Sequence, residues 1–178
     1  MKGDISRALS CVGISRRDDL FIHSNIGYFG RLPEANDAKS YYRVFKEAIL
    51  ECIGVEGTFV MPTFSYSFCK GDSFDPDKTP GVCGLLSEMM RNDPDSIRSH
   101  DANFSIVAIG KNAVKYTSNC STKSFGEQSF WERLLFERGK ICNFNFDAGS
   151  SFIHYVEYCL KVPYRFEKPF YGKLIVDG

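Results

Sequence analysis

The fold is decided by the stretch from Ala38 to Met61, AKSYYRVFKEAILECIGVEGTFVM, which predicts a helix followed by a buried strand. Apolar residues at positions 41, 45, 48, 49, 52 and 53 fall on one helical face, and Gly54 provides a stop. A short apolar strand from Gly57 to Met61 follows, and Pro62 ends it. One helix packed against one strand is the repeating unit of a layered α/β domain.

The same alternation extends on both sides of this stretch. Further strands are predicted at residues 19–23, 104–109, 141–146 and 174–176, and further helices at residues 4–9, 81–91, 127–137 and 150–159. The polar segment 67–80 is predicted to be a long loop. Strands separated by helices predict an α/β fold in which ligands bind beyond the ends of the strands.

Length and charge exclude several classes of protein. The 178 residues suit one domain, and 22 Lys and Arg balance 22 Asp and Glu for a net charge of +0. This balance argues against a nucleic-acid binder and against a polybasic membrane clamp. No apolar run approaches the ~20 residues of a membrane span. The seven cysteines contain no CxxC pair, so we expect no metal site and a reducing, cytoplasmic environment.

Two residues in the last third of the chain are spaced as a general base and the carboxylate that orients it would be. His154 and Glu157 are three positions apart and therefore lie on one face of the predicted helix 150–159. An imidazole beside a carboxylate is a common general-base arrangement. The alternative, a histidine bonded to a neighbour and a glutamate on a solvated face, is the commoner outcome of this spacing alone.

Polar residues also follow two of the predicted strands. His23, Ser24 and Asn25 end the first strand, and the hydroxyls of Thr63 and Ser65 come just after the second. Such groups can cradle a phosphate, although a plain turn fits them as well. The GxGxxG and GxxxxGK[ST] patterns of nucleotide-binding loops are absent from the sequence. Asp101 precedes the strand 104–109 and, taken alone, is typical of a loop acceptor.

Six motifs in order resemble the aminoglycoside 3-N-acetyltransferase family, a group of antibiotic N-acetyltransferases outside the GNAT fold. They are HSN, EGTFVMPTFS, TPGVCGLLSEMMR, IRSHDANFSIVAIG, SFGEQSFWERL and SSFIHYVE. The resemblance implies a single three-layer α/β/α domain with a mixed central sheet. It also implies an enzyme that uses acetyl-CoA as cosubstrate, bound in a cleft beside a small-molecule amine.

The resemblance also implies roles for particular residues. His154 and Glu157 correspond to the family's TxLHxAE motif and are predicted to be catalytic. The predicted CoA-binding residues are His23, Ser24, Asn25, Thr63, Ser65, Ser105 and Gly126. The main departure is Asp101, which stands where the family's RSxHP motif has its catalytic histidine. Asp101 is predicted to accept the proton or to anchor an ammonium group, although a carboxylate is a weaker base than imidazole unless its pKa is raised.

These expectations combine into one functional prediction with three rivals. We expect residues 1–178 to form an N-acetyltransferase domain that lacks the family's C-terminal segment and acts on an amino sugar, nucleotide-linked rather than an aminoglycoside. A homo-oligomer is compatible with the sequence. The rivals are a metal-dependent hydrolase with His23, Asp101, His154 and Glu157 as ligands, a covalent Cys–His acetyltransferase, and a non-catalytic CoA-binding remnant.

Overall fold

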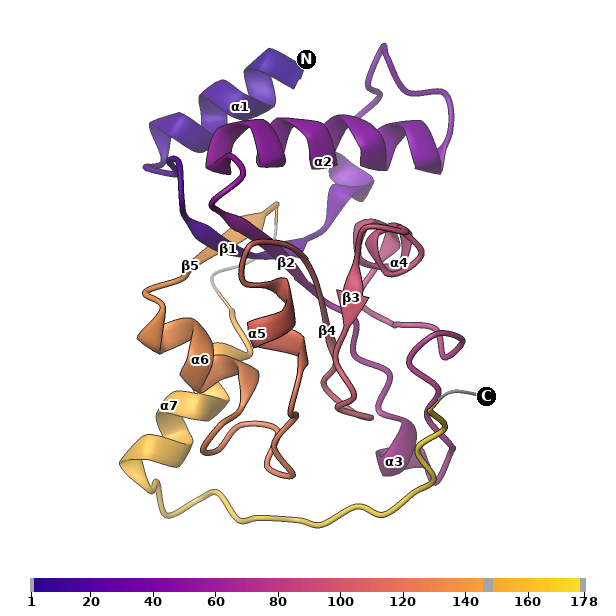
Figure 1. Ribbon diagram of the computed structural model, residues 1–178, viewed down its shortest axis with the longest axis vertical. Helices are drawn as coiled ribbons and strands as arrows, with labels where there is room; N and C mark the ends of the chain where they lie inside the picture. Colours follow the sequence, from indigo (N-terminus) through magenta and orange to yellow (C-terminus); the bar gives the residue numbers. More distant parts are fainter. Residues whose placement is uncertain (1, 146–148, 177–178) are drawn as a thin grey trace.

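A five-stranded sheet forms the centre of the molecule (Figure 1). The computed structural model describes residues 2–145 and 149–176. The strands have the order β3-β4-β2-β1-β5. Their bounds are β1 Asp19–Ser24, β2 Thr58–Pro62, β3 Ile97–Arg98, β4 Ile106–Gly110 and β5 Lys140–Phe144. Strand β1 runs parallel to β2 and β5, whereas β4 runs antiparallel to β2 and β3, so the sheet is mixed as predicted.

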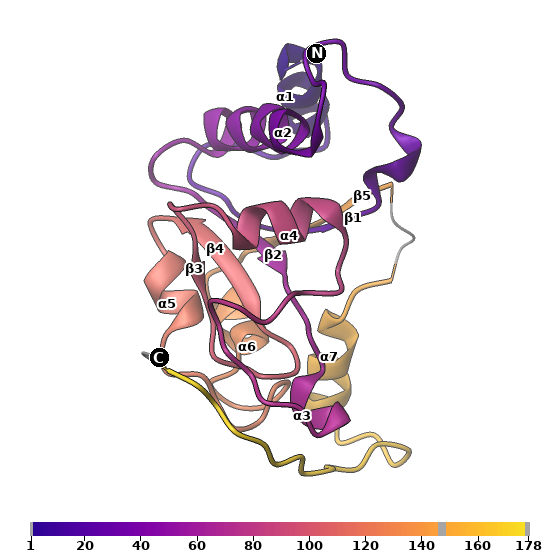
Figure 2. The ribbon, with the colours of Figure 1, turned by 90° about the vertical axis from the view of Figure 1, so that its right-hand side faces the viewer.

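Helices cover both faces of this sheet. Helices α1, α2 and α4 lie on one side, and α5, α6 and α7 lie on the other (Figures 1 and 2). Their bounds are α1 Lys2–Cys11, α2 Ala38–Ile53, α3 Ser67–Lys70, α4 Leu85–Arg91, α5 Ala113–Thr117, α6 Phe130–Phe136 and α7 Phe152–Leu160, with a 3₁₀ turn, η1, at Ile26–Tyr28. The predicted three-layer α/β/α architecture is confirmed. None of the helices in the described part of the chain has the length and apolarity needed to cross a membrane.

Each face of the sheet has its own hydrophobic core. On β1, Leu20 and Ile22 pack with the α2 side, and Phe21 packs with the α6 and α7 side. Alternation of side chains along a strand produces this division, and burial on both faces explains why the strand is apolar throughout. Trp131 of α6 is 1% exposed and lies in the second core.

Helix α2 shows how the deciding stretch folds locally. The Asp37 carboxylate accepts a hydrogen bond from the Ser40 N–H at 2.7 Å and the Ser40 hydroxyl accepts one from the Asp37 N–H, which forms a capping box. At the other end Gly54 adopts a φ of 68°, a conformation that suits glycine. The predicted helix 38–53 is therefore confirmed at both ends.

Several predicted elements differ from the structure. The helix expected from residue 81 begins at Leu85, after Gly84 with a φ of 100°. The predicted strand 174–176 is an isolated bridge between Phe74 and Leu174, because its backbone pairs with a loop and not with the sheet. The strand predicted at 141–146 is observed at Lys140–Phe144, and Phe146 lies outside the described residues. Strand β3 and helices α3 and α5 were not predicted.

The last part of the chain, residues 161–176, forms an extended segment that we call the C-terminal strap. It leaves α7 and crosses the molecule toward α3 (Figures 1 and 2). Backbone hydrogen bonds hold its far end: the Phe74 N–H donates to the Lys173 carbonyl at 2.9 Å, and the Ile175 N–H donates to the Phe74 carbonyl at 2.8 Å. The strap thus ties α7 to the loop that follows α3.

Candidate active site

The polar end of β1 lies next to the start of α7. His23 is buried at the end of β1, and its Nε2 lies 3.4 Å from the hydroxyl of Ser150, just before α7. Its ring also meets Phe21 edge to face at 4.8 Å. Burial lowers the pKa of His23 and favours the neutral imidazole. The neighbouring Asn25 N–H donates to the Phe144 carbonyl at 2.8 Å, which binds this loop to β5.

His154 and Glu157 meet on the first turns of α7, as their spacing predicted. His154 Nδ1 lies 3.0 Å from Glu157 Oε2, and the side chain of Glu157 is 12% exposed against 36% for His154. Contact with His154 and the nearby Arg165 guanidinium outweighs burial and holds the pKa of Glu157 below its usual range. The glutamate is therefore a carboxylate at neutral pH.

Arg165, which the sequence analysis did not single out, completes this group. Its Nη2 lies 2.6 Å from Glu157 Oε2 and 2.7 Å from His154 Nδ1. A turn after α7 brings it there: the Val162 N–H donates to the Glu157 carbonyl, and the Arg165 N–H donates to the Val162 carbonyl. Lys161 in a left-handed conformation and Pro163 are the local signals of that turn, but they do not predict where Arg165 lies.

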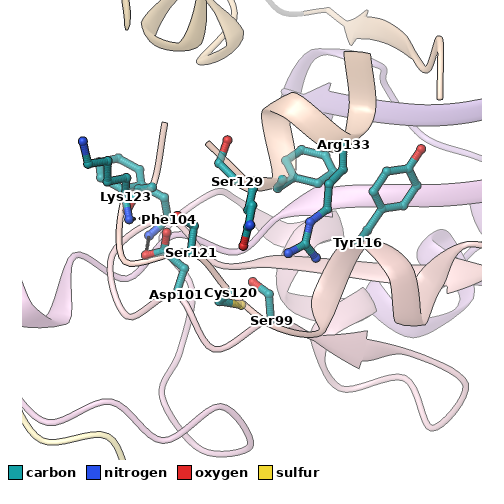
Figure 3. A pocket seen from close by; sticks show the side chains of 12 residues that line it. Ser99, Asp101, Phe104, Tyr116, Cys120, Ser121, Lys123, Ser129 and Arg133 are labelled. Carbon is teal, nitrogen blue, oxygen red and sulfur yellow. Dashed lines mark hydrogen bonds between the residues drawn. The ribbon is translucent and has the colours of Figure 1, made fainter. Parts of the chain in front are cut away.

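Asp101 lies in the tight loop between β3 and β4. Its Oδ1 accepts hydrogen bonds from the Asn103 N–H at 2.9 Å and from the Phe104 N–H at 2.8 Å. It borders a cavity of about 20 Å³, whose lining includes Ser129 of the α6 cap and Arg133 (Figure 3). A cavity of this size holds roughly one water molecule. The carboxylate thus has the loop-acceptor geometry, and its predicted catalytic role stays a prediction.

Two aromatic rings link the Asp101 loop to His154. Phe104 and Phe125 meet edge to face with 4.7 Å between ring centroids, and Phe125 meets the His154 ring at 4.9 Å. Phe125 precedes Gly126, which is buried; a Cβ built on Gly126 would lie 2.8 Å from the Lys123 Cβ. The small residue at position 126 therefore lets this loop fold tightly beside α7.

The hydroxyls of Thr63, Ser65 and Ser105 are buried and bonded within the protein. Ser105 Oγ donates to the Thr63 carbonyl at 2.7 Å, and Ser65 Oγ donates to the Ala102 carbonyl at 2.7 Å. Thr63 Oγ1 also lies 3.2 Å from Ser105 Oγ. These bonds support the loops beyond β2 and β4. Direct contact with CoA through these hydroxyls stays a prediction.

Arg98 is the second residue that the sequence analysis missed. It is 9% exposed, and its guanidinium donates to the carbonyls of Thr63, Pro76 and Thr79 and to Ser105 Oγ. Burial lowers the pKa of Arg98 to about 10, so it remains a cation at neutral pH. Its place in the motif IRSHDANFS could have indicated that Arg98 belongs to the site, since this motif also contains Asp101 and Ser105.

The rival chemistries find little support in the described residues. No group of three or more His, Cys, Asp or Glu side chains in that part of the chain is placed to hold a metal ion. Burial raises the pKa of four thiols, those of Cys69, Cys83, Cys120 and Cys142, which is the opposite of what a thiolate nucleophile needs. Cys159, on α7, is exposed.

A larger cavity of about 420 Å³ lies away from these residues, between α6, β5 and the start of α7. It is lined by Leu134, Leu135, Arg138, Gly139, Ile141 and Phe152. None of the predicted catalytic or CoA-binding residues borders it, so the chemistry is not expected there.

Together, the mixed sheet, its two helical layers and the His–Glu pair at the start of α7 define a three-layer α/β protein with a candidate general acid–base site. Comparison with protein families identifies its family. The aminoglycoside 3-N-acetyltransferase family model matches residues 21–178, and the chain belongs to this family. No protein of curated function has a sequence significantly similar to it.

Solved structures share the fold at low sequence identity. The YokD protein from Bacillus subtilis has a TM-score of 0.78 and 24% identity over 92% of this chain and 71% of that one. The aminoglycoside acetyltransferase AAC(3)-IIb has a TM-score of 0.78 and 22% identity, over 91% of this chain and 65% of that one. AAC-IIIb in its binary complex with CoASH has a TM-score of 0.69 and 21% identity. The match covers 80% of this chain but only 58% of AAC-IIIb.

Proposed function

We propose that this chain transfers the acetyl group of acetyl-CoA directly to the amine of an amino sugar. The observation that carries the proposal is the family match over residues 21–178. The contact between His154 and Glu157, the two residues shared with the family's TxLHxAE motif, supports it. The solved complex of AAC-IIIb with CoASH supports acetyl-CoA as the cosubstrate. A cytoplasmic location and a homo-oligomeric state stay predictions.

Acetyl transfer involves one bond formed, one bond broken and one proton moved. The amine nitrogen bonds to the thioester carbon, the carbon–sulfur bond breaks, and the proton of the amine ends on the CoA thiolate or on water. Asp101, His154 and Glu157 are the groups proposed to assist proton transfer and to stabilise the developing charge. His23, Ser24, Asn25, Thr63, Ser65, Ser105 and Gly126 are proposed to form the CoA side, directly or by shaping its loops.

The acceptor is proposed to be an amino sugar of low positive charge. A polycationic drug is best held by free carboxylates, but three of the acidic residues in the segments 67–80 and 92–96 already have cationic partners. Asp93 and Asp95 both bind Lys46, and Asp75 pairs with Lys78. The related AAC-VIa has been solved bound to Sisomicin, so an aminoglycoside is the alternative acceptor.

A thiol-release assay tests the proposal. The purified chain is mixed with acetyl-CoA and a panel of nucleotide-linked amino sugars and aminoglycosides. Titration measures the free CoA thiol, and mass spectrometry determines the masses of the products. We expect thiol release with at least one amine and a product heavier by one acetyl group. The fastest amine identifies the acceptor class.

A non-catalytic CoA-binding protein is the second candidate. The observation that favours it is the geometry of Asp101, whose carboxylate is directed to loop N–H groups at the position of the family's catalytic histidine. Binding of CoA without thiol release for any amine would support this candidate and overturn the first.

A further inference from the structure

In the group formed by His154, Glu157 and Arg165, only two of the three contacts can be hydrogen bonds in any one protonation state of His154. Three atoms close a triangle: His154 Nδ1 and Glu157 Oε2 are 3.0 Å apart, and Arg165 Nη2 is 2.6 Å from Oε2 and 2.7 Å from Nδ1. A guanidinium nitrogen only donates and a carboxylate oxygen only accepts. The state of Nδ1 is therefore set by its two neighbours.

One possible state of His154 has a hydrogen on Nδ1. It would donate to Glu157, but it would also place two donor nitrogens, Nδ1 and Arg165 Nη2, 2.7 Å apart with no acceptor between them. A doubly protonated His154 would add a second cation beside the guanidinium. Both states conflict with the 2.7 Å contact between His154 Nδ1 and Arg165 Nη2.

With Nδ1 unprotonated, the two shortest contacts are both hydrogen bonds from Arg165 Nη2, and only the longest, 3.0 Å between Nδ1 and Glu157 Oε2, joins two acceptors, which share this guanidinium nitrogen as their donor. Arg165 Nη2 carries two hydrogens, of which one reaches the Glu157 carboxylate and the other reaches the Nδ1 lone pair. The neutral ring then carries its hydrogen on Nε2. We propose that Arg165 is a positioning residue that holds His154 as the Nε2–H tautomer.

This assignment gives His154 a specific role, which rests on the proposed acetyl transfer. A ring with hydrogen on Nε2 presents a donor at that atom, so it stabilises the oxyanion that develops on the thioester carbonyl and does not take the proton of the amine there. Glu157, held as a carboxylate, fixes Arg165. Proton acceptance then belongs to Asp101 or to water.

The tautomer can be measured without any activity. Long-range ¹H–¹⁵N correlation spectra of the 178-residue chain distinguish protonated from unprotonated ring nitrogens. They are recorded at about pH 8.5, where an imidazole with the reference pKa of about 6.5 is neutral. The chain has three histidines, and a His154→Gln spectrum assigns the signal. We expect an unprotonated Nδ1 and a protonated Nε2 for His154.

Two substitutions identify Arg165 as the cause. A carboxylate 3.0 Å from Nδ1 would by itself favour hydrogen on Nδ1. Arg165→Leu is therefore expected to switch His154 to Nδ1–H, whereas Arg165→Lys, which keeps a donor, retains Nε2–H. Lys168→Leu, an exposed change in the same strap, is the matched control and leaves the tautomer unchanged.

Either of two results would overturn the proposal: Nδ1–H in the unsubstituted protein, or Nε2–H retained by a folded Arg165→Leu protein. The first result needs no variant, so the test survives if Arg165→Leu does not fold. Because the spectra do not depend on turnover, absence of thiol release would reject the proposed function and leave the tautomer question decided.

Discussion

At the scale of single residues, the site depends on two arginines that the sequence motifs did not single out for function. Arg165 contacts the His–Glu pair from outside α7, and Arg98 joins loops that are distant in sequence. The contacts of both arginines arise from the tertiary path of the chain. A motif can predict that His154 and Glu157 share a helical face, but it carries no information on which later residue returns to them.

Glu157→Gln is expected to lower kcat for acetyl transfer by about 10²–10⁴-fold, because the neutral amide no longer fixes the Arg165 guanidinium that sets the state of His154. Initial rates of thiol release measure this effect. Glu127→Gln, an exposed change in the loop before α6, is the control and keeps the full rate. An unchanged rate for Glu157→Gln would remove this residue from the mechanism.

Arg98→Ala is expected to lower the free energy of unfolding by about 3–5 kcal/mol, since the buried Pro76 carbonyl and the half-buried Thr79 carbonyl lose their donor and the buried Thr63 carbonyl loses one of its two side-chain donors. Arg98→Lys retains the charge but loses the planar fork, and an intermediate loss is expected. Urea unfolding monitored by circular dichroism measures both, with the exposed Arg43→Ala as control. A loss for Arg98→Ala no larger than that of the control would contradict the structural role.

At the scale of elements, local chemistry explains what could be predicted. Helix α2 has a cap, a periodic apolar face and a glycine stop, so its bounds follow from residues next to one another. Strand β3 has two residues and α5 has five, which is too short for a periodic pattern. The strand expected at 174–176 fails for another reason: its apolar residues pair with Phe74 in a loop.

Asp37→Ala is expected to lower the free energy of unfolding by about 0.5–2 kcal/mol, because the first turn of α2 loses its side-chain acceptor. Thermal unfolding measures the change, with Lys39→Ala in the same turn as control. Asp37→Asn, which keeps an acceptor, should recover most of the loss. An equal loss in all three variants would mean that the cap is not the cause.

At the scale of the whole molecule, β1 joins the edge strand β5 to the rest of the sheet through parallel pairing with β2 and β5. An ion pair reinforces the junction, since Lys140 Nζ lies 2.7 Å from Asp18 Oδ2. Burial acts to raise the pKa of Asp18, but hydrogen bonds from Lys140 and Ser15 outweigh it and hold the pKa below its usual range.

Stability that depends on Asp18 is therefore lost in acid. A carboxyl with a lowered pKa stabilises the fold fully above its ordinary value of about 3.9, and the contribution disappears as the pH falls through the folded value. Asp18→Asn is expected to cost about 0.5–1 kcal/mol at pH 7, since Lys140 is 40% exposed. Urea midpoints should show this difference at pH 7 and a progressively smaller one as the pH falls below the ordinary carboxyl value of about 3.9. A difference independent of pH would exclude the ion pair as its source.

The order of the strands also has a consequence for synthesis of the chain on the ribosome. Leu20 pairs with Lys140, so a nascent chain can join β1 to β2 and β4 well before β5 has emerged. Until then, one edge of an apolar strand that is buried in the finished protein faces water or a chaperone. A polypeptide interrupted before residue 140 would present that edge to any other unpaired strand.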